Sequence, residues 1–300
     1  MSSTIVLNQS NIVGSDNNVF VYNFPNSVEF QNHEIAVQSV NMYYSWFNIS
    51  ATLNNHKFTI SWKHSVLNIT TNTYTSYYHV ITITLPDGMY EITDINNYFQ
   101  YQMKYYGMYL IKSSGENEYF AEWILNPTQY SVQLNLFPVP ISLPTGYTQP
   151  SNFIGFPDST LCPAITIPND FYKIVGFAKS FSFGNSNKSQ SQLSITAPQV
   201  QPNPTLLFSL SNISNKYSNP SSIVHALSST VGFGMQMVDR PQQFAFNQLL
   251  KGTYNQIRLS ILGTNLQPIK IIDPNVTICL IIHSKKDITD DLLSALKGSK

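Results

Sequence analysis

The chain has 300 residues, of which only 11% are charged, and its formal net charge at pH 7 is zero. In soluble proteins about a quarter of the residues are charged. We therefore expect a polar, weakly charged surface with little electrostatic repulsion between two copies of the chain. The sequence contains no Lys/Arg stripe for nucleic acid, no apolar run long enough for a membrane span and no start typical of a signal peptide.

Alternation of apolar and polar residues predicts strands in the first third of the chain. The segments are residues 19–24, 34–44, 57–62 and 78–85. Pro25 is expected to close the first segment. Pro86, followed by Asp and Gly, has the residues of a turn after the last one.

The period then changes to that of a helix over residues 93–106. Thr93 can act as its N-cap, and Gly107 stands just past its end. One apolar stripe runs along this segment and contains Ile92, Ile95, Phe99, Met103 and Tyr106. We expect this helix to close one end of a β-sandwich.

The middle of the chain combines two strand patterns with a proline-rich stretch. Strands are predicted at residues 119–125 and 130–137, and a short helical turn at 171–175. Prolines recur over residues 138–168, yet Phe153 and Phe156 are too apolar for a disordered linker. We therefore expect a packed loop or a loop that contacts a neighbour.

The last third shows the clearest alternation, in residues 206–210, 253–262 and 276–283. A period of two over this length is typical of half-buried strands. Turn residues at 263–268 and 273–275 predict hairpin-like connections between them. The chain is accordingly predicted to be all-β, an antiparallel β-sandwich.

The C-terminal residues 287–300 differ from the rest because they suit a short amphipathic helix. Acidic residues stand at the start, Lys297 near the end, and Leu292, Leu293 and Leu296 on one side. Two interpretations remain open, a frayed end and a peg that docks on a partner.

Chemistry typical of an enzyme is missing from the sequence. The histidines lack metal-ligand spacing with cysteines or carboxylates, and His56 and His64 are separated by a predicted strand. Neither a nucleophile elbow nor a phosphate-binding glycine loop occurs. Glu116 and Glu118 are weak candidates for a glycosidase pair. We predict no enzyme, no metal and no cofactor. The two cysteines, Cys162 and Cys279, favour a reducing compartment.

Several stretches together resemble a known viral family. They are LPDGMYEITDINNYF at 85–99, NPSSIVHA at 219–226, GTYNQIRL at 252–259 and PIKIIDPNVTICLII at 268–282. This combination resembles the minor capsid (penton) proteins of virophages and polinton-like viruses, most closely those of mavirus-type virophages. The resemblance is a pattern of turns and alternation that is better over the last eighty or so residues than elsewhere.

The resemblance implies a single jelly roll over residues 1–286 with a helix- and loop-rich insertion at 86–184, followed by the tail at 287–300. It implies a homopentamer at the five-fold vertices of a virion, made in the host cytoplasm, with a double-jelly-roll major capsid protein as partner. A host receptor is a further candidate partner. Candidate assembly contacts are Leu292, Leu293, Leu296, Phe153 and Phe156, and the terminal segments 1–11 and 287–300 are expected inside the shell.

A carbohydrate- or receptor-binding β-sandwich, such as a fibre head or lectin, is the alternative class. Trp46, Trp62 and Trp123, with many tyrosines, could supply faces on which sugars stack. The low charge fits a surface largely in contact with neighbours, and coding bias towards Asn, Ile and Tyr would produce it as well. A hydrolytic jelly-roll enzyme is a third class that no residue cluster supports.

Overall fold

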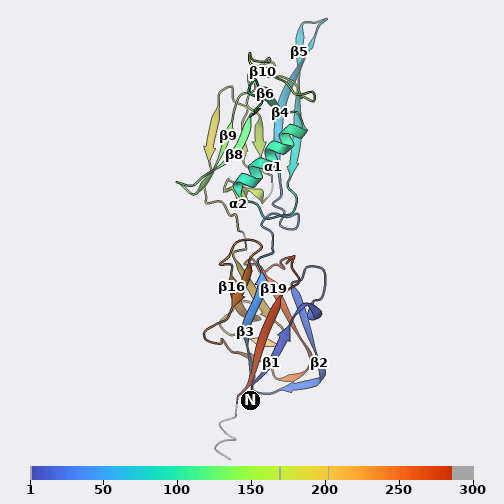
Figure 1. Cartoon of the computed structure of the whole chain (residues 1–300), viewed down its shortest axis with the longest axis vertical. Coiled ribbons are helices and arrows are strands. Elements are labelled where there is room, and N and C mark those ends of the chain that lie inside the picture. Colours follow the sequence, from blue (N-terminus) through green and yellow to red (C-terminus); the bar gives the residue numbers. More distant parts are fainter. Residues whose placement is uncertain (1, 169, 202, 286–300) are drawn as a thin grey trace, which may run out of the picture. The chain divides into compact units, whose positions relative to one another are not determined.

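The computed structural model describes residues 2–168, 170–201 and 203–285, and most of its regular structure is β-strand (Figure 1). The chain folds into two compact units: Met1–Trp46 with Asn203–Lys300, and Phe47–Pro202. The two ends of the chain therefore build the first unit, and the second unit is inserted between them. The insertion predicted at 86–184 lies inside this second unit, whose bounds are wider.

The described residues of the first unit form two antiparallel sheets. Sheet A contains, in order across the sheet, β1 (Ser2–Leu7), β20 (Thr277–Ser284), β3 (His33–Tyr43), β18 (Asn247–Leu249) and β15 (Ile213–Ser214), with β17 (Gln236–Asp239) also paired to β3. Sheet B contains β16 (Ile223–Ser228), β14 (Thr205–Leu210), β19 (Gly252–Leu262) and β2 (Val19–Phe30). A 3-10 turn, η1 (Gln9–Asn11), follows β1.

The strand order of the first unit is that of a jelly roll. Strands β17 and β18 both pair with β3 and together occupy one position in sheet A. When the two-residue edge strand β15 is left out of the count, sheet A runs first, eighth, third and sixth in chain order, and sheet B runs second, seventh, fourth and fifth. This is the double Greek-key arrangement of a jelly roll, so the predicted all-β, single jelly-roll fold is confirmed. The second unit is inserted between its third and fourth strands.

Alternating side chains explain why these segments form a two-layer core. In β20, Ile278, Leu280 and Ile282 are buried, and the residues between them are more exposed. However, β19 and β20 lie in different sheets, so the predicted hairpin between them is wrong. The connection crosses from one layer to the other, and alternation alone does not reveal which sheet a strand joins.

Strand β2 is longer than its sequence predicted because it continues past Pro25 to Phe30. Its pairing with β19 shifts register between Tyr254 and Gln256, which places the proline segment opposite an irregularity in the ladder. A proline fits a strand at such a bulge or at a sheet edge, because it has no N–H to donate. Strand β2 is also the last strand of sheet B.

In the part of the second unit that the structure describes, there are three small antiparallel sheets and two helices. One sheet is β12 (Ser182–Phe183), β11 (Ala164–Thr166), β4 (Lys57–Asn68) and β5 (Thr73–Thr84). The others are β13 (Gln190–Leu193), β9 (Ser131–Leu136) and β8 (Ala121–Asn126), and β10 (Tyr147–Thr148), β6 (Tyr109–Lys112) and β7 (Asn117–Tyr119). The helices are α1 (Ile92–Tyr105) and α2 (Phe171–Val175).

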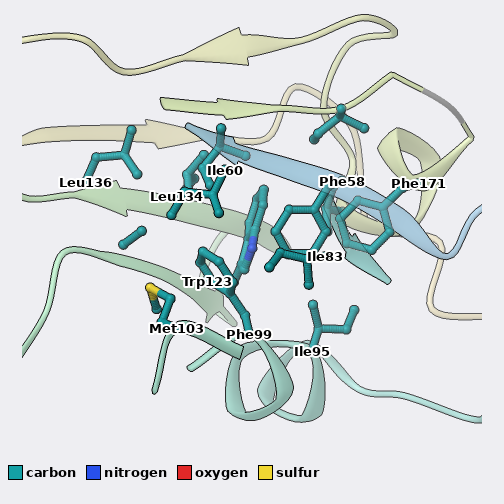
Figure 2. Close-up of a cluster of buried hydrophobic side chains, with 14 of the residues drawn as sticks. Phe58, Ile60, Ile83, Ile95, Phe99, Met103, Trp123, Leu134, Leu136 and Phe171 are labelled. Carbon is teal, nitrogen blue, oxygen red and sulfur yellow. The ribbon is translucent and has the colours of Figure 1, made fainter. Parts of the chain in front are cut away.

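The second unit has its own aromatic core (Figure 2). The Phe58 ring stacks on Phe171 at 4.9 Å between centroids and meets the edges of Phe99 and Trp123 at 5.2 and 5.8 Å. Helix α1 contributes Phe99 with three other buried residues, namely Ile92, Ile95 and Met103. The predicted stripe is confirmed for these four, whereas Tyr106 is exposed.

Helix α1 covers the core of the second unit and packs on β8. The expectation that it closes an end of the jelly roll was therefore wrong, because periodicity identifies a buried face but not the partner that buries it. It also starts earlier than predicted: Glu91 occupies the N-cap position, and its backbone N–H donates to the Asp94 carboxylate at 2.9 Å. Thr93 lies inside the first turn.

Candidate assembly surfaces

Phe153 and Phe156 belong to the proline-rich loop of the second unit and pack partly against its core. Their ring centroids are 4.6 Å apart, and Phe153 lies 6.4 Å from the buried ring of Trp62. The Phe156 carbonyl accepts a hydrogen bond from the Ser65 backbone N–H at 2.8 Å. The loop is thus ordered and supports β4, and the assembly role of the two phenylalanines stays a prediction.

Asp158 fixes the same loop to the hairpin formed by β4 and β5. Its carboxylate accepts hydrogen bonds from Lys63 Nζ at 2.5 Å and from Ser76 Oγ at 2.9 Å, and its backbone N–H donates to Ser65 Oγ at 3.0 Å. These donors, led by Lys63, lower the pKa of Asp158 from 3.8 to about 2. At neutral pH the carboxylate is therefore charged and tied to both strands.

Of the two terminal segments expected to make assembly contacts, the structure describes the N-terminal one. Residues 2–7 form β1, which pairs with β20 inside sheet A and is part of the jelly roll. Leu292, Leu293 and Leu296 lie outside the described residues. Their role in assembly accordingly remains a prediction from the sequence.

The β4–β5 hairpin carries an exposed apolar surface that the sequence did not predict. Its outer face, called here the hairpin face, presents Leu67, Tyr74, Tyr78 and Val80 to solvent, and Val80 is 65% exposed. Leu67 pairs directly with Tyr74 across the two strands. Exposed apolar clusters of this kind are typical of interaction sites.

Strand β5 also leaves a backbone edge open. Within the described residues its one strand neighbour is β4, along the whole length of twelve residues. Such an edge has backbone N–H and C=O groups available for another strand, and addition of a strand is a common mode of recognition. The hairpin therefore combines an apolar face with an edge that can pair.

The sequence held a signal for this hairpin that the strand predictions did not use. Tyr74 and Tyr78 stand at even spacing with Val80, but residues 63–77 are otherwise rich in Ser, Thr and Asn. Because both faces here are largely exposed, polar residues interrupt this alternation, and the two strands were predicted shorter than they are.

The tryptophans proposed as sugar platforms are unavailable for that role. Trp46, Trp62 and Trp123 are each at most 2% exposed. Trp46 Nε1–H donates to the Asn203 carbonyl at 3.2 Å, and Trp62 Nε1–H to the Gly155 carbonyl at 3.0 Å. They are core residues, so this basis for a lectin-like function is lost.

Two of the titratable side chains, His64 and Glu118, contact neighbouring side chains within the second unit. His64 is sandwiched between Tyr77 and His79, with ring centroids at 5.2 and 4.5 Å, and burial together with His79 lowers its pKa. Glu118 pairs with Lys112.

The described residues include no group of three or more His, Cys, Asp or Glu that could hold a metal ion. None of the described helices is long and apolar enough to cross a membrane.

Cys162 lies in the proline-rich loop and is buried. The side chain is 1% exposed, and burial raises the pKa of its thiol to about 11. Its Sγ lies 3.2 Å from the Lys188 carbonyl. Cys279, on β20, is half-buried, and both thiols are free.

No protein-family model matches the chain, and no curated protein matches it. Among solved structures, the chain is similar to the mavirus penton protein in its crystal structure, with 10% sequence identity over 95% of this chain and 99% of that chain. The TM-score is 0.43. A likeness this distant carries no conclusion about function, and the jelly-roll assignment rests on the strand order described above.

Proposed function

We propose that this protein is a structural capsid protein that forms the homopentameric penton at the five-fold vertices of an icosahedral virion. The observation that carries the proposal is the strand order of the first unit, because jelly rolls occur in viral capsid and lectin domains and in cupins. The buried tryptophans weigh against the lectin class. The sequence resemblance to virophage penton proteins supports the capsid class.

The proposed mechanism is assembly. Five copies form a closed ring in which one flank of the jelly roll meets the opposite flank of the next copy. A net charge of zero removes long-range repulsion between the copies. Contacts that are weak singly gain strength because each is repeated around the ring and again where the ring meets the shell.

The proposed partners follow from this position. A double-jelly-roll major capsid protein surrounds each pentamer, and a host receptor is a further candidate at the exposed vertex. The hairpin face and the edge of β5 are candidate contact surfaces for either partner, because they expose apolar side chains and backbone groups together. The protein would be made in the host cytoplasm and function in the virion.

The test is the mass of the purified protein in solution by light scattering, with and without its major capsid protein, followed by negative-stain imaging. We expect rings with five times the chain mass of 33.9 kDa, alone or in the mixture. A stable trimer would instead favour the fibre-head class. A monomer under both conditions would overturn the proposal.

The variant pair Tyr78→Lys with Val80→Lys tests the hairpin contact separately. Both residues are exposed, so the fold should persist, while binding to the partner that contacts the hairpin should weaken. The control is Tyr101→Lys, on an exposed position of α1 in the same unit. If the hairpin variant and the control incorporate into capsids equally well, the hairpin is not a contact surface.

A further inference from the structure

The jelly roll has an open pocket where its two sheets end at β1 and β2. Its volume is about 510 Å³, within the range of typical ligand sites. The apolar part of its lining comes from both sheets and consists of Ile5, Tyr22, Phe24, Val28, Phe30 and Ile282. Ser3, Thr4, His33 and Ser284 complete the lining with polar groups.

The apolar residues of this pocket lie on the inward faces of their strands, and those on β1 and β20 are buried, whereas most of those on β2 are incompletely covered. Ile5 and Ile282 alternate with exposed or half-buried neighbours in sheet A, as core residues do. On β2, by contrast, Tyr22, Phe24 and Val28 are only half-buried. Ring centroids are 5.3 Å apart for Tyr22–Phe24 and 5.8 Å apart for Phe24–Phe30, so the rings form a continuous wall.

On the opposite side of the sandwich, a side-chain contact links the two sheets. His225 on β16 and Asp239 on β17 are joined at 2.6 Å between Nε2 and Oδ2. Strands β16 and β2 are the two edge strands of sheet B. Strand β16 is linked to sheet A by this contact, and β2 lines the open pocket. Partly exposed inward aromatic rings are a costly state unless something covers them.

The described part of the chain ends at the rim of this pocket. Ser284 lines the pocket, and Lys285 is fixed beside the β2–β3 turn by two contacts. Its backbone N–H donates to the Asn32 carbonyl at 2.9 Å, and its Nζ lies 2.7 Å from Glu34 Oε2. The turn is flanked by Phe30 and His33, which both line the pocket. The described chain therefore ends at Lys285, next to the opening.

We propose that this pocket binds the C-terminal segment of its own chain through Leu292, Leu293 and Leu296. Leu292 follows Lys285 by seven residues, which reach about 23 Å when extended and leave ample length to turn back into an opening at the rim. Tethering to the same molecule gives the segment a high effective concentration. The aliphatic side chains would cover the wall of Tyr22, Phe24 and Phe30.

This proposal concerns the free chain and does not depend on the capsid function. The three leucines were predicted as a docking peg, and the pocket supplies a site for that peg within the molecule. While they occupy it, they are unavailable to another partner. Any partner that uses the leucine stripe must therefore compete with the pocket.

Crosslinking in the full-length chain tests the proposal. Val28→Cys in the pocket and Leu293→Cys are combined with Cys279→Ser, and a short bis-maleimide is added to dilute protein. Cys162 is buried and should not react. We expect an intramolecular crosslink at monomer mass, formed at least tenfold faster than in the control. The control pairs Leu293→Cys with Val238→Cys, which is exposed on β17.

Two results would overturn the proposal. One is a rate no greater than that of the Val238 control, and the other is a product at dimer mass, which would assign the pocket to the tail of another copy. A second readout uses an apolar fluorescent dye. Changing Leu292, Leu293 and Leu296 to Ser should increase dye binding severalfold, and adding Phe24→Ser should reverse it. Unchanged dye binding in the triple variant would contradict an occupied pocket.

Discussion

At the scale of single residues, Asp158 makes the stability of the second unit depend on pH. Its pKa lies at about 2 in the folded protein and at 3.8 ordinarily, so its contribution is present above pH 4 and is lost as the pH falls towards 2. We expect Asp158→Asn to unfold more easily at pH 7 and to lose less stability across this window. Urea unfolding followed by tryptophan fluorescence measures this, because Trp62 and Trp123 lie in the same unit.

The control for this change is Asp16→Asn, which removes an exposed carboxylate from the first unit. It should leave the acid response of the second unit as it is in the wild type. If Asp158→Asn shows the same loss of stability between pH 4 and pH 2 as the wild type, the Lys63 and Ser76 contacts do not stabilise the loop in solution.

Gly107 is the residue at which the backbone leaves α1 and meets the proline-rich loop. Its φ is +68°, and a Cβ there would lie 1.9 Å from the Asn152 carbonyl oxygen. The Asn152 side-chain amide donates to the carbonyls of Lys104 and Tyr105 at 3.2 and 3.0 Å. The loop therefore satisfies carbonyl groups at the C-terminal end of α1 and must stay close to it. We expect Gly107→Ala to destabilise the second unit by more than the about 1–2 kcal/mol of left-handed strain alone.

Gly115→Ala is the control that separates the cost of left-handed backbone strain from the cost of a steric clash with the Asn152 carbonyl. Gly115 has a φ of +86°, but a Cβ there meets nothing within 4 Å, so it should cost only the strain. Thermal unfolding of both variants gives the comparison. Equal losses in the two variants would mean that the loop moves aside and that the close approach to Asn152 is not maintained.

At the scale of elements, α1 is held by its buried face. Phe99 is fully buried and meets Phe58 at 5.2 Å, so Phe99→Ala should cost about 3–5 kcal/mol of unfolding free energy. Tyr101 is 60% exposed on the same helix, and Tyr101→Ala should stay within about 0.5 kcal/mol of the wild type. Urea titrations of both variants are the measurement, and similar losses would show that the helix does not pack as described.

The same helix shows what a sequence can predict. The spacing of Ile92, Ile95, Phe99 and Met103 predicted a helix and its buried face, because that information is local. The partner of that face is set by contacts between distant segments, so the assignment to the jelly roll failed. Strands 205–210 and 252–262 were predicted well for the same local reason.

The candidate surfaces were harder to predict than the core. Phe153 and Phe156 were singled out because they are apolar in a loop. Both are partly buried against the core of the second unit, and their role in assembly stays a prediction. The hairpin face was missed, because exposed strands need no alternation and Tyr78 was assigned to a sandwich strand. Strand β5 is an edge strand because no other described strand pairs with its free side. That property depends on the arrangement of the whole sheet and cannot be predicted from the residues of one segment.

At the scale of the whole molecule, the inserted unit can be tested by removing it. The first unit is continuous across the insertion, because Trp46 Nε1–H donates to the Asn203 carbonyl at 3.2 Å. Replacing residues 47–202 with a short Gly/Ser linker should therefore leave the jelly roll folded, as independent cores generally allow. Circular dichroism should show β-structure, and the emission of Trp46 should remain that of a buried indole.

The excised protein also tests where the ring contacts lie. If copies meet through the flanks of the jelly roll, the short chain should form the same number of subunits per particle as the full chain in light scattering. A folded monomer from the short chain, beside a pentamer from the full chain, would place the contacts in the inserted unit. In that case Tyr78→Lys with Val80→Lys in the full chain should also break the ring, because the hairpin presents the exposed apolar face and the open edge of that unit.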